Sequence, residues 1–262
     1  MKGNAGAVSN QSAAKTLAVI EHLAARDNQP QRLQDIAGEL SMSASTAFRF
    51  LQALAASGYV QQDPASSRYF LTTKICSVAH SVSSNIHLHD LALPIMKALA
   101  ADWGESVCLA IEQDMTVVYV GVVQGPDQML RTMQHIGNRA PMHCTGVGKL
   151  LLLNYTEDEI DTLIARKGLP ALTGNTLTTR EALIAELAAV RDRDCAYDNE
   201  ECEIGARCIA VPARDYTKRV VAALSVTGPI FRMTDDRLRE RMDSILAARD
   251  ALSALLGYDA AR

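Results

Sequence analysis

Three stretches near the start of the chain repeat apolar residues at the spacing of a helix face. The spacing predicts a long helix over residues 12–25 and a short amphipathic helix over residues 33–40. A third helix is expected to begin at about Ala44, after the polar break at residues 41–43, and Gly58 is typical of the residue that follows a helix end. Two short helices joined by a brief break, behind a longer helix, predict a helix-turn-helix.

The hydrophobic period changes after the third helix. Residues 59–62 and 68–71 have strand-like composition and flank the turn residues 63–67, which predicts a β-hairpin, and therefore a wing. A connecting helix is expected over residues 73–88, and another helix at about residues 90–102. The first part of the chain is therefore predicted to be a winged helix-turn-helix domain.

The remaining chain alternates between strand-like and helix-like patterns. The run Thr178-Thr179-Arg180-Glu181 indicates a capping box at a helix start, and Thr234 is expected to cap the last helix. Because two groups of strands are separated and followed by helices, we predict an α+β domain with an antiparallel sheet flanked by helices. The expected strands are 107–111, 115–123, 129–133, 203–212 and 219–227, and the expected helices are 145–154, 157–166, 180–192 and 235–256.

The composition is that of a globular protein, with 48% hydrophobic and 21% charged residues. No apolar run approaches the roughly 20 residues of a membrane-spanning helix, and the first residues lack the apolar segment of a secretory signal. We therefore expect a cytoplasmic protein with no membrane partner. The six cysteines form no Cys-x-x-Cys pair, so we expect them to be reduced and mostly buried, with no structural zinc and no cofactor.

The net charge of −4 taken alone argues against nucleic acid, but the charge is unevenly distributed. Residues 1–74 hold seven Lys and Arg against five Asp and Glu, a balance of +2, whereas the rest of the chain carries −6. This asymmetry permits DNA binding by the first domain without establishing it.

The outward face of the third predicted helix carries side chains suited to DNA. Hydroxyl groups there can bond phosphates or bases, and Arg49 can pair with guanine or with a phosphate. The plain alternative is a helical hairpin used for protein contacts, with a solvated Ser/Thr face. The candidate DNA-contacting residues are Ser43 (also the expected helix cap), Ser45, Thr46, Phe48, Arg49, Gln52 and, at the wing, Arg68.

The segment Gly146-Val147-Gly148-Lys149, at a predicted helix start, has only part of a phosphate-loop pattern. A phosphate loop needs glycine at position 143 and Ser or Thr at position 150, where this chain has His143 and Leu150. What remains is a helix N-terminus, whose free amides and positive dipole end suit a carboxylate. A glycine at position 146 would let a ligand approach the backbone closely.

Polar residues recur on one face of the last two predicted strands. Ser225 and Thr227 share a face, as do Cys208 and Ala210 on the neighbouring strand. Two hydroxyls on one face of an apolar strand have either a packing partner or a ligand, and the residues by themselves leave both possibilities open.

Eight motifs lie along nearly the whole chain, from about residue 12 to residue 257: KTLAVIE (15–21), LQDIA (33–37), STAFRFL (45–51), RAPMH (139–143), GVGK (146–149), YDNEE (197–201), GARCIA (205–210) and ALSVTGP (223–229). Together they are similar to the motifs of the IclR family of bacterial transcriptional regulators. Many members carry Pro-Lys where this chain has Ser43-Ala44, and His where it has Phe48, so the operator preference of the family does not transfer.

The resemblance implies a winged helix-turn-helix DNA-binding domain over 12–73, a linker helix over 74–89 and a GAF-like α+β effector-binding domain over 90–257. It implies a repressor or dual regulator of a catabolic operon, acting as a homodimer or tetramer on double-stranded operator DNA. A small organic acid effector would control that binding. The ligand contacts that it implies are Gly146, Val147, Asp198, Cys208, Ser225 and Thr227, with Met133 and Ile136 as apolar walls.

A thiol enzyme is one competing function. Cys208 with Asp198, or Cys144 beside His143, could form a nucleophile with a base. A reactive cysteine needs a nearby base and an electropositive setting, and Cys208 lies in the middle of an apolar strand. We therefore expect no catalytic residue.

A metal-responsive regulator is the other competing function. His87, His89, His135 and His143 are possible ligands together with the cysteines. Their scatter matches no recognisable ligand spacing, so we expect no metal site.

Overall fold

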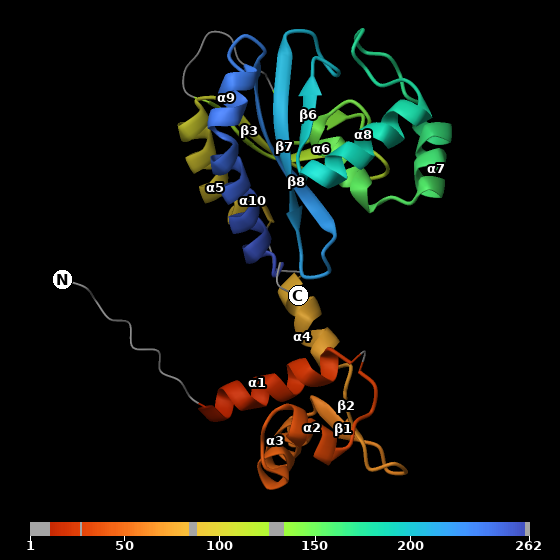
Figure 1. Ribbon diagram of the computed structural model, residues 1–262, viewed down its shortest axis with the longest axis vertical. Helices are drawn as coiled ribbons and strands as arrows, with labels where there is room; N and C mark the ends of the chain where they lie inside the picture. The colour runs from red at the N-terminus through yellow and green to blue at the C-terminus, as the bar shows by residue number, and fades with distance from the viewer. Residues whose placement is uncertain (1–10, 27, 84–87, 126–133, 260–262) are drawn as a thin grey trace, which may run out of the picture. The chain divides into compact units, whose positions relative to one another are not determined.

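The computed structural model describes residues 11–26, 28–83, 88–125 and 134–259 (Figure 1). The chain divides into two compact units, residues 1–86 and residues 87–262. No helix among the described residues is both long and apolar enough to span a bilayer.

The first unit is a winged helix-turn-helix with a single apolar core. The inward stripes of its helices meet the hairpin, and Leu23, Ile36 and Leu51 are fully buried where they meet. This agrees with the sequence prediction. Its elements are α1 (Gln11–Ala24), α2 (Leu33–Glu39), α3 (Ala44–Ala56), β1 (Val60–Gln62), β2 (Tyr69–Leu71) and α4 (Lys74–Ser83).

The ends of α3 have the predicted chemistry. Ser43 is the N-cap, and its Oγ accepts a hydrogen bond from the backbone amide of Thr46 at 3.3 Å. Gly58, just after the helix, has a φ of +76°, a left-handed conformation that costs glycine least. The antiparallel pairing of β1 with β2 then forms the wing.

The second unit is built on one antiparallel sheet of six strands, in the order β5-β4-β3-β8-β7-β6. The long central strands β7 and β8 are buried on both faces, which explains their nearly continuous apolar sequence. The strands are β3 (Ser106–Glu112), β4 (Val117–Val123), β5 (Arg139–Ala140), β6 (Ala196–Asn199), β7 (Ala206–Arg214) and β8 (Val220–Pro229).

Helices cover both faces of this sheet (Figure 1). One face packs on α5 (Leu88–Trp103), α9 (Asp235–Glu240) and α10 (Met242–Leu255) around the buried Trp103. The other face packs on α6 (Gly146–Leu151), α7 (Glu157–Lys167) and α8 (Arg180–Arg193). The short helix η1 (Leu152–Asn154) continues α6. The predicted α+β class is confirmed.

The bulge in β4 decides which side chains face α6. Leu109 of β3 pairs with Gly121, and Ala110 pairs with Tyr119, so Val120 is the extra residue. An extra residue reverses the alternation of the strand. As a result Tyr119 packs in the core beside α6, whereas Gly121 faces Met96 on the opposite side of the sheet.

Several predicted boundaries in the second unit are wrong. The single helix expected over 235–256 is broken at Arg241, because the Arg241 guanidinium donates to the backbone carbonyl of Asp102 at 2.5 Å. Trp103 Nε1 also donates to Ser244 Oγ at 2.9 Å, which fixes the start of α10 on α5. The spacing of apolar residues along the sequence does not reveal these tertiary contacts. Strands β5 and β6 were not predicted, and they are only short edge strands.

The helix starts and the connection also differ. Thr179, not Thr178, caps α8, with its Oγ1 accepting from the amide of Ala182 at 3.2 Å, so there is no capping box at this helix. The capping box of the second unit is instead at the start of α7. The connecting helix is described only over Lys74–Ser83, and α5 begins at Leu88. The strand expected at 129–133 lies outside the described residues.

Candidate functional site

A small cavity of about 40 Å³ lies between the start of α6 and one face of the sheet; we call it the α6 cavity. A buried water needs roughly 10–15 Å³ measured in this way, so the space suits a ligand of only a few heavy atoms. Of the described residues, those that line it are Tyr119, Gln134, Thr145, Gly146, Val147, Asp198, Cys202, Glu203, Ala206, Cys208, Ser225 and Thr227.

Strand register brings the predicted polar residues together. Asp198 of β6 pairs with Cys208 of β7, which pairs with Thr227 of β8, and these three form a row across the sheet. Ser225 lies in the next row on the same face, opposite Ala210. The predicted alternation on these strands is therefore what the structure shows.

Two buried polar side chains present unpaired oxygens in this cavity. Ser225 is 2% exposed, and its hydroxyl has no hydrogen-bond partner among the described residues. Asp198 Oδ1 accepts from the backbone amides of Glu201 at 2.8 Å and Cys202 at 3.3 Å. No described residue donates to the other carboxylate oxygen, Oδ2. Burial of Asp198 raises the pKa of its carboxyl to about 6.

Gly146 has a packing role that its sequence did not predict. A Cβ at this position would lie 2.9 Å from Cys208 Sγ and 3.1 Å from Ala210 Cβ, both on β7. The glycine therefore permits the close packing of α6 against the sheet. It also lines the α6 cavity, where the close approach of a ligand stays a prediction. The cap of α6 is Thr145, whose Oγ1 accepts from the amide of Gly148 at 3.1 Å.

Lys149 is buried, which explains why the partial phosphate-loop pattern is misleading. Its ammonium donates to Glu201 Oε1 at 2.5 Å and to the carbonyl of Tyr197 at 2.9 Å, and it lies 3.5 Å from Glu186 Oε1. The ion pair ties α6 to the turn after β6. That turn carries Cys202, which lines the α6 cavity.

Three thiols in this region, those of Cys108, Cys144 and Cys208, are not poised for catalysis, whereas a hydrogen bond with Cys144 lowers the pKa of Cys202. Burial raises the pKa of the Cys208 thiol well above its usual range, and it raises the pKa of Cys108 to about 12. A hydrogen bond with Cys202, together with burial, raises the pKa of Cys144. His143 donates from Nε2 to the carbonyl of Pro170 at 3.2 Å, so that nitrogen is not a base for a thiol.

The metal hypothesis gains no support from the part of the chain that the structure describes. No group of three or more His, Cys, Asp and Glu residues there could hold a metal ion. His87, one of the candidate ligands, lies outside the described residues.

In the first unit, the predicted DNA face of α3 is open to solvent. Phe48 is 44% exposed, and Arg49 forms no ion pair with any described residue. Ser43, Ser45 and Gln52 are also exposed, whereas Thr46 is half-buried and bonds Ser43 Oγ at 2.8 Å. At the wing, Arg68 is half-buried, with Nη1 3.5 Å from the carbonyl of Pro30.

Two predicted ligand contacts do not belong to this cavity as described. Ile136 is 62% exposed and is not among the described residues that line it, so the structure gives its predicted role as an apolar wall no support. Met133 lies outside the described residues. The sequence analysis did not identify Tyr119 or Cys202 as cavity residues. In the sequence, Tyr119 is only a lone aromatic residue in an apolar strand, and no local pattern predicts the bulge that turns its side chain toward α6.

Comparisons with known proteins agree over both units. The family model described as the IclR helix-turn-helix domain matches residues 12–64, and the one described as bacterial transcriptional regulator IclR C-terminal matches residues 80–254. The HTH-type transcriptional regulator KdgR of Escherichia coli is 34% identical over 228 residues, which cover 86% of each chain.

Two further similarities cover nearly the full length. The acetate operon repressor of Salmonella typhimurium is 32% identical over 249 residues, covering 94% of this chain and 90% of the repressor. The crystal structure of the Thermotoga maritima IclR matches with a TM-score of 0.62 at 26% identity, over 95% of this chain and 99% of that chain.

Proposed function

This chain belongs to the IclR family of bacterial transcriptional regulators, and from that premise we propose that a small organic acid in the α6 cavity controls its binding to operator DNA. The chain is a DNA-binding transcriptional regulator and not an enzyme. On our proposal it represses a catabolic operon, or regulates it in both directions.

One observation carries the ligand site. The Ser225 hydroxyl and Asp198 Oδ2 both lie at a cavity, on residues with little exposure, and neither has a partner among the described residues. Neither oxygen is among the fully buried polar atoms without a partner, so each stays open to a group that enters the cavity. A ligand, or the water that it displaces, would supply the missing hydrogen bonds.

The chemistry of the cavity favours a short acid with a second polar group. The ligand carboxylate would accept from the amides at Gly146 and Val147 and from the hydroxyls of Ser225 and Thr227. An ionised Asp198 repels a carboxylate placed next to it, so it would instead accept a hydrogen bond from a hydroxyl or hydrate on the ligand.

Control of DNA binding needs an energetic link between the two units. A ligand shifts an equilibrium only by its differential affinity for the two states, typically about 1–3 kcal/mol. We propose that an occupied α6 cavity favours one arrangement of two reader domains over another. The segment from α4 to α5 is the covalent path between the units.

The Ser225→Ala variant tests this proposal. It should lower the affinity for the effector by about tenfold, because one hydrogen bond to a charged group is lost, while DNA binding without ligand stays nearly intact. The measurements are calorimetry with the acid found in a thermal-shift screen of carboxylic, keto and sugar acids, and gel shifts on the upstream region of the gene.

Ser244→Ala is the matched control. Ser244 is a partly buried serine that accepts from Trp103 on the opposite face of the sheet, so its loss should leave the ligand response unchanged. A full ligand response in Ser225→Ala would refute the α6 cavity as the effector site. Lost DNA binding without ligand would show that Ser225 is structural.

A further inference from the structure

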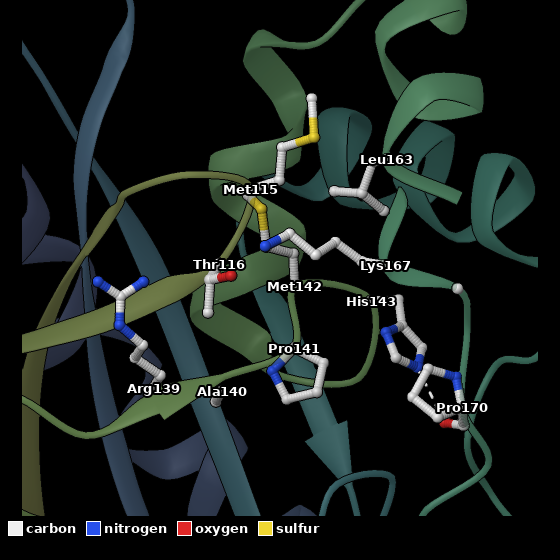
Figure 2. A pocket seen from close by; sticks show the side chains of 11 residues that line it. Met115, Thr116, Arg139, Ala140, Pro141, Met142, His143, Leu163, Lys167 and Pro170 are labelled. Atoms are coloured by element: carbon white, nitrogen blue, oxygen red, sulfur yellow. Dashed lines mark hydrogen bonds between the residues drawn. The ribbon is translucent and has the colours of Figure 1, made fainter. Parts of the chain in front are cut away.

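A second and larger cavity, of about 260 Å³, lies in the same unit, next to the C-terminal end of α7; we call it the α7 cavity (Figure 2). Its volume is just below the roughly 300–1,000 Å³ of small-molecule pockets, so it suits a small metabolite. No residue in its lining takes part in the α6 cavity. The lining is Met115, Thr116, Arg139, Ala140, Pro141, Met142, His143, Leu163, Lys167, Gly168 and Pro170.

His143 gives the α7 cavity a buried hydrogen-bond acceptor. The residue is 1% exposed, and its Nε2 lies 3.2 Å from the carbonyl oxygen of Pro170. A carbonyl can only accept, so Nε2 carries the proton. Burial lowers the pKa of the ring, which is therefore neutral, with a bare lone pair on Nδ1.

The bare nitrogen faces the cavity. Figure 2 shows Nδ1 of His143 turned toward the side where Pro141, Met142 and Lys167 lie. No described residue donates a hydrogen bond to it. An acceptor that has no described partner and is open to a cavity can take a hydrogen bond from a ligand that donates one there.

Two cations border the same cavity. Arg139 forms no ion pair with any described residue, and its guanidinium donates only to the neutral amide of Gln113 at 3.0 Å. Lys167 lies 3.5 Å from Asp114, but that carboxylate also lies 3.6 Å from Arg166. A second carboxylate, that of Glu112, accepts from the backbone amide of Met115 at 2.7 Å. Three cations therefore stand against two carboxylates around the cavity, a positive balance that suits an anionic ligand.

The rest of the lining is apolar apart from Thr116, and it includes one residue with a strained backbone. Met115 and Asp114 have φ values of +55° and +53° in the two-residue turn between β3 and β4. This turn normally selects Asn-Gly or Asp-Gly. A methionine kept in a left-handed conformation costs free energy, and here it places a thioether beside Met142 and Leu163 in the cavity wall (Figure 2).

We propose that the α7 cavity is a second small-molecule site, which binds an amphipathic carboxylate with a hydroxyl at its far end. The carboxylate lies at Lys167 and Arg139, the hydrocarbon part packs on Met115, Met142 and Leu163, and the hydroxyl donates to Nδ1 of His143. Residues 143–146 are consecutive, so a ligand on His143 contacts the same segment that begins the α6 cavity.

Methyl NMR of the full-length protein locates binding without a known effector. With ¹³C-methyl methionine labelling, 6-hydroxyhexanoate and 8-hydroxyoctanoate are titrated into the millimolar range. The methyl signals of Met115 and Met142 should shift, while those of Met96 and Met233, buried in the core on the opposite face of the sheet, stay in place. Hexanoate, without the hydroxyl, and 1,6-hexanediol, without the charge, should each bind about tenfold more weakly.

Variants separate this site from the α6 cavity. Lys167→Gln should weaken binding about tenfold, and Lys167→Arg should restore it. Lys167 is partly exposed, so neither change threatens the fold. His143→Phe should remove the advantage of the hydroxy acids over hexanoate. Ser225→Ala should leave binding at the α7 cavity unchanged, so a failure of the proposed effector site leaves this inference standing.

Two results would overturn the inference. One is that the Met115 and Met142 signals stay fixed at millimolar concentrations of both hydroxy acids. The other is that the diol shifts them as strongly as the hydroxy acids do, since the cations would then have no part in binding.

Discussion

Asp198 uses its two carboxylate oxygens in different ways. Oδ1 holds the turn after β6 through two backbone amides, whereas Oδ2 lies at the α6 cavity without a described partner. Because burial raises the pKa of this carboxyl to about 6, its charge changes within the range of ordinary assays.

The first prediction at the residue scale is a pH dependence of effector binding. Above pH 6 the ionised Asp198 is the stronger acceptor for the ligand hydroxyl, but it also repels the ligand carboxylate across a small buried cavity. Below pH 6 the protonated carboxyl still accepts through its carbonyl oxygen and no longer repels the ligand. Affinity should therefore rise as the pH falls from 7.5 to 5.5. Calorimetry at the two pH values measures this, and Asp198→Asn should flatten the difference. If the affinity of the wild type instead decreases when the pH is lowered from 7.5 to 5.5, and that of the variant does not, the proposed role of Asp198 is contradicted.

The buried Lys149 leads to a second prediction. Lys149→Met would leave Glu201 in the interior without its counter-ion, and Glu201 Oε2 already has no hydrogen-bond partner. Breaking a buried pair by removing one member typically costs about 3–5 kcal/mol, and replacing both members by apolar residues restores much of it. Urea unfolding of Lys149→Met and of Lys149→Met/Glu201→Leu measures both effects.

Lys97→Met is the control for that experiment. Lys97 lies on the exposed face of α5, so the free energy of unfolding should change by no more than about 0.5 kcal/mol. If Lys149→Met is as stable as this control, the ion pair does not hold the turn that shapes the α6 cavity.

At the scale of elements, α3 is suited to enter the major groove. It is capped by Ser43, it buries Ala47, Leu51 and Leu54, and it leaves Arg49 exposed. The side chains on the solvent-facing side of α3 therefore take no part in the core. A change on it should affect DNA binding and not folding.

Arg49→Ala tests this prediction. A base-directed arginine should cost about 1–3 kcal/mol and relax sequence preference, whereas a phosphate-directed arginine should weaken binding to all sequences alike. Gel-shift titrations on the native upstream region and on scrambled DNA distinguish the two, with circular dichroism to check the fold. Arg191→Ala, exposed on α8, is the control. Equal affinity in Arg49→Ala and the control would remove Arg49 from the interface.

At the scale of the whole molecule, the charge is divided between the units. Residues 1–74 carry only +2, so one reader has few cations for phosphate contacts. Two linked readers gain affinity because the second binding event is intramolecular. The exposed Leu17 on α1 and Val78 on α4 are apolar surface available for pairing.

We therefore predict at least a dimer that reads two half-sites about one helical turn, or roughly 10 base pairs, apart. Light scattering at micromolar concentration should give a mass of at least twice the 28.3 kDa of one chain. Footprinting should protect two segments in phase. A 28.3 kDa particle in solution would contradict the prediction.

The sequence by itself determined the elements whose information is local. Helix stripes, the Ser43 cap, Gly58 after α3 and the alternation around Ser225 all depend on neighbours within a few residues, so their patterns show in the chain. The family resemblance supplied six of the twelve described residues that line the α6 cavity. The placement of Gly146 at the start of α6 was also correct, but its close packing on β7 was not predicted.

Only the tertiary structure decided features that depend on distant partners. The break between α9 and α10 at Arg241 involves its hydrogen bond to Asp102 of α5. The side of the sheet on which Tyr119 lies depends on the bulge in β4, and the space at position 146 is limited by Cys208 on β7. Likewise the ion pair of Lys149 and the bare nitrogen of His143 exist only because of Glu201 and Pro170. Packing and hydrogen bonding between segments far apart in the chain set these features, and no local pattern encodes them.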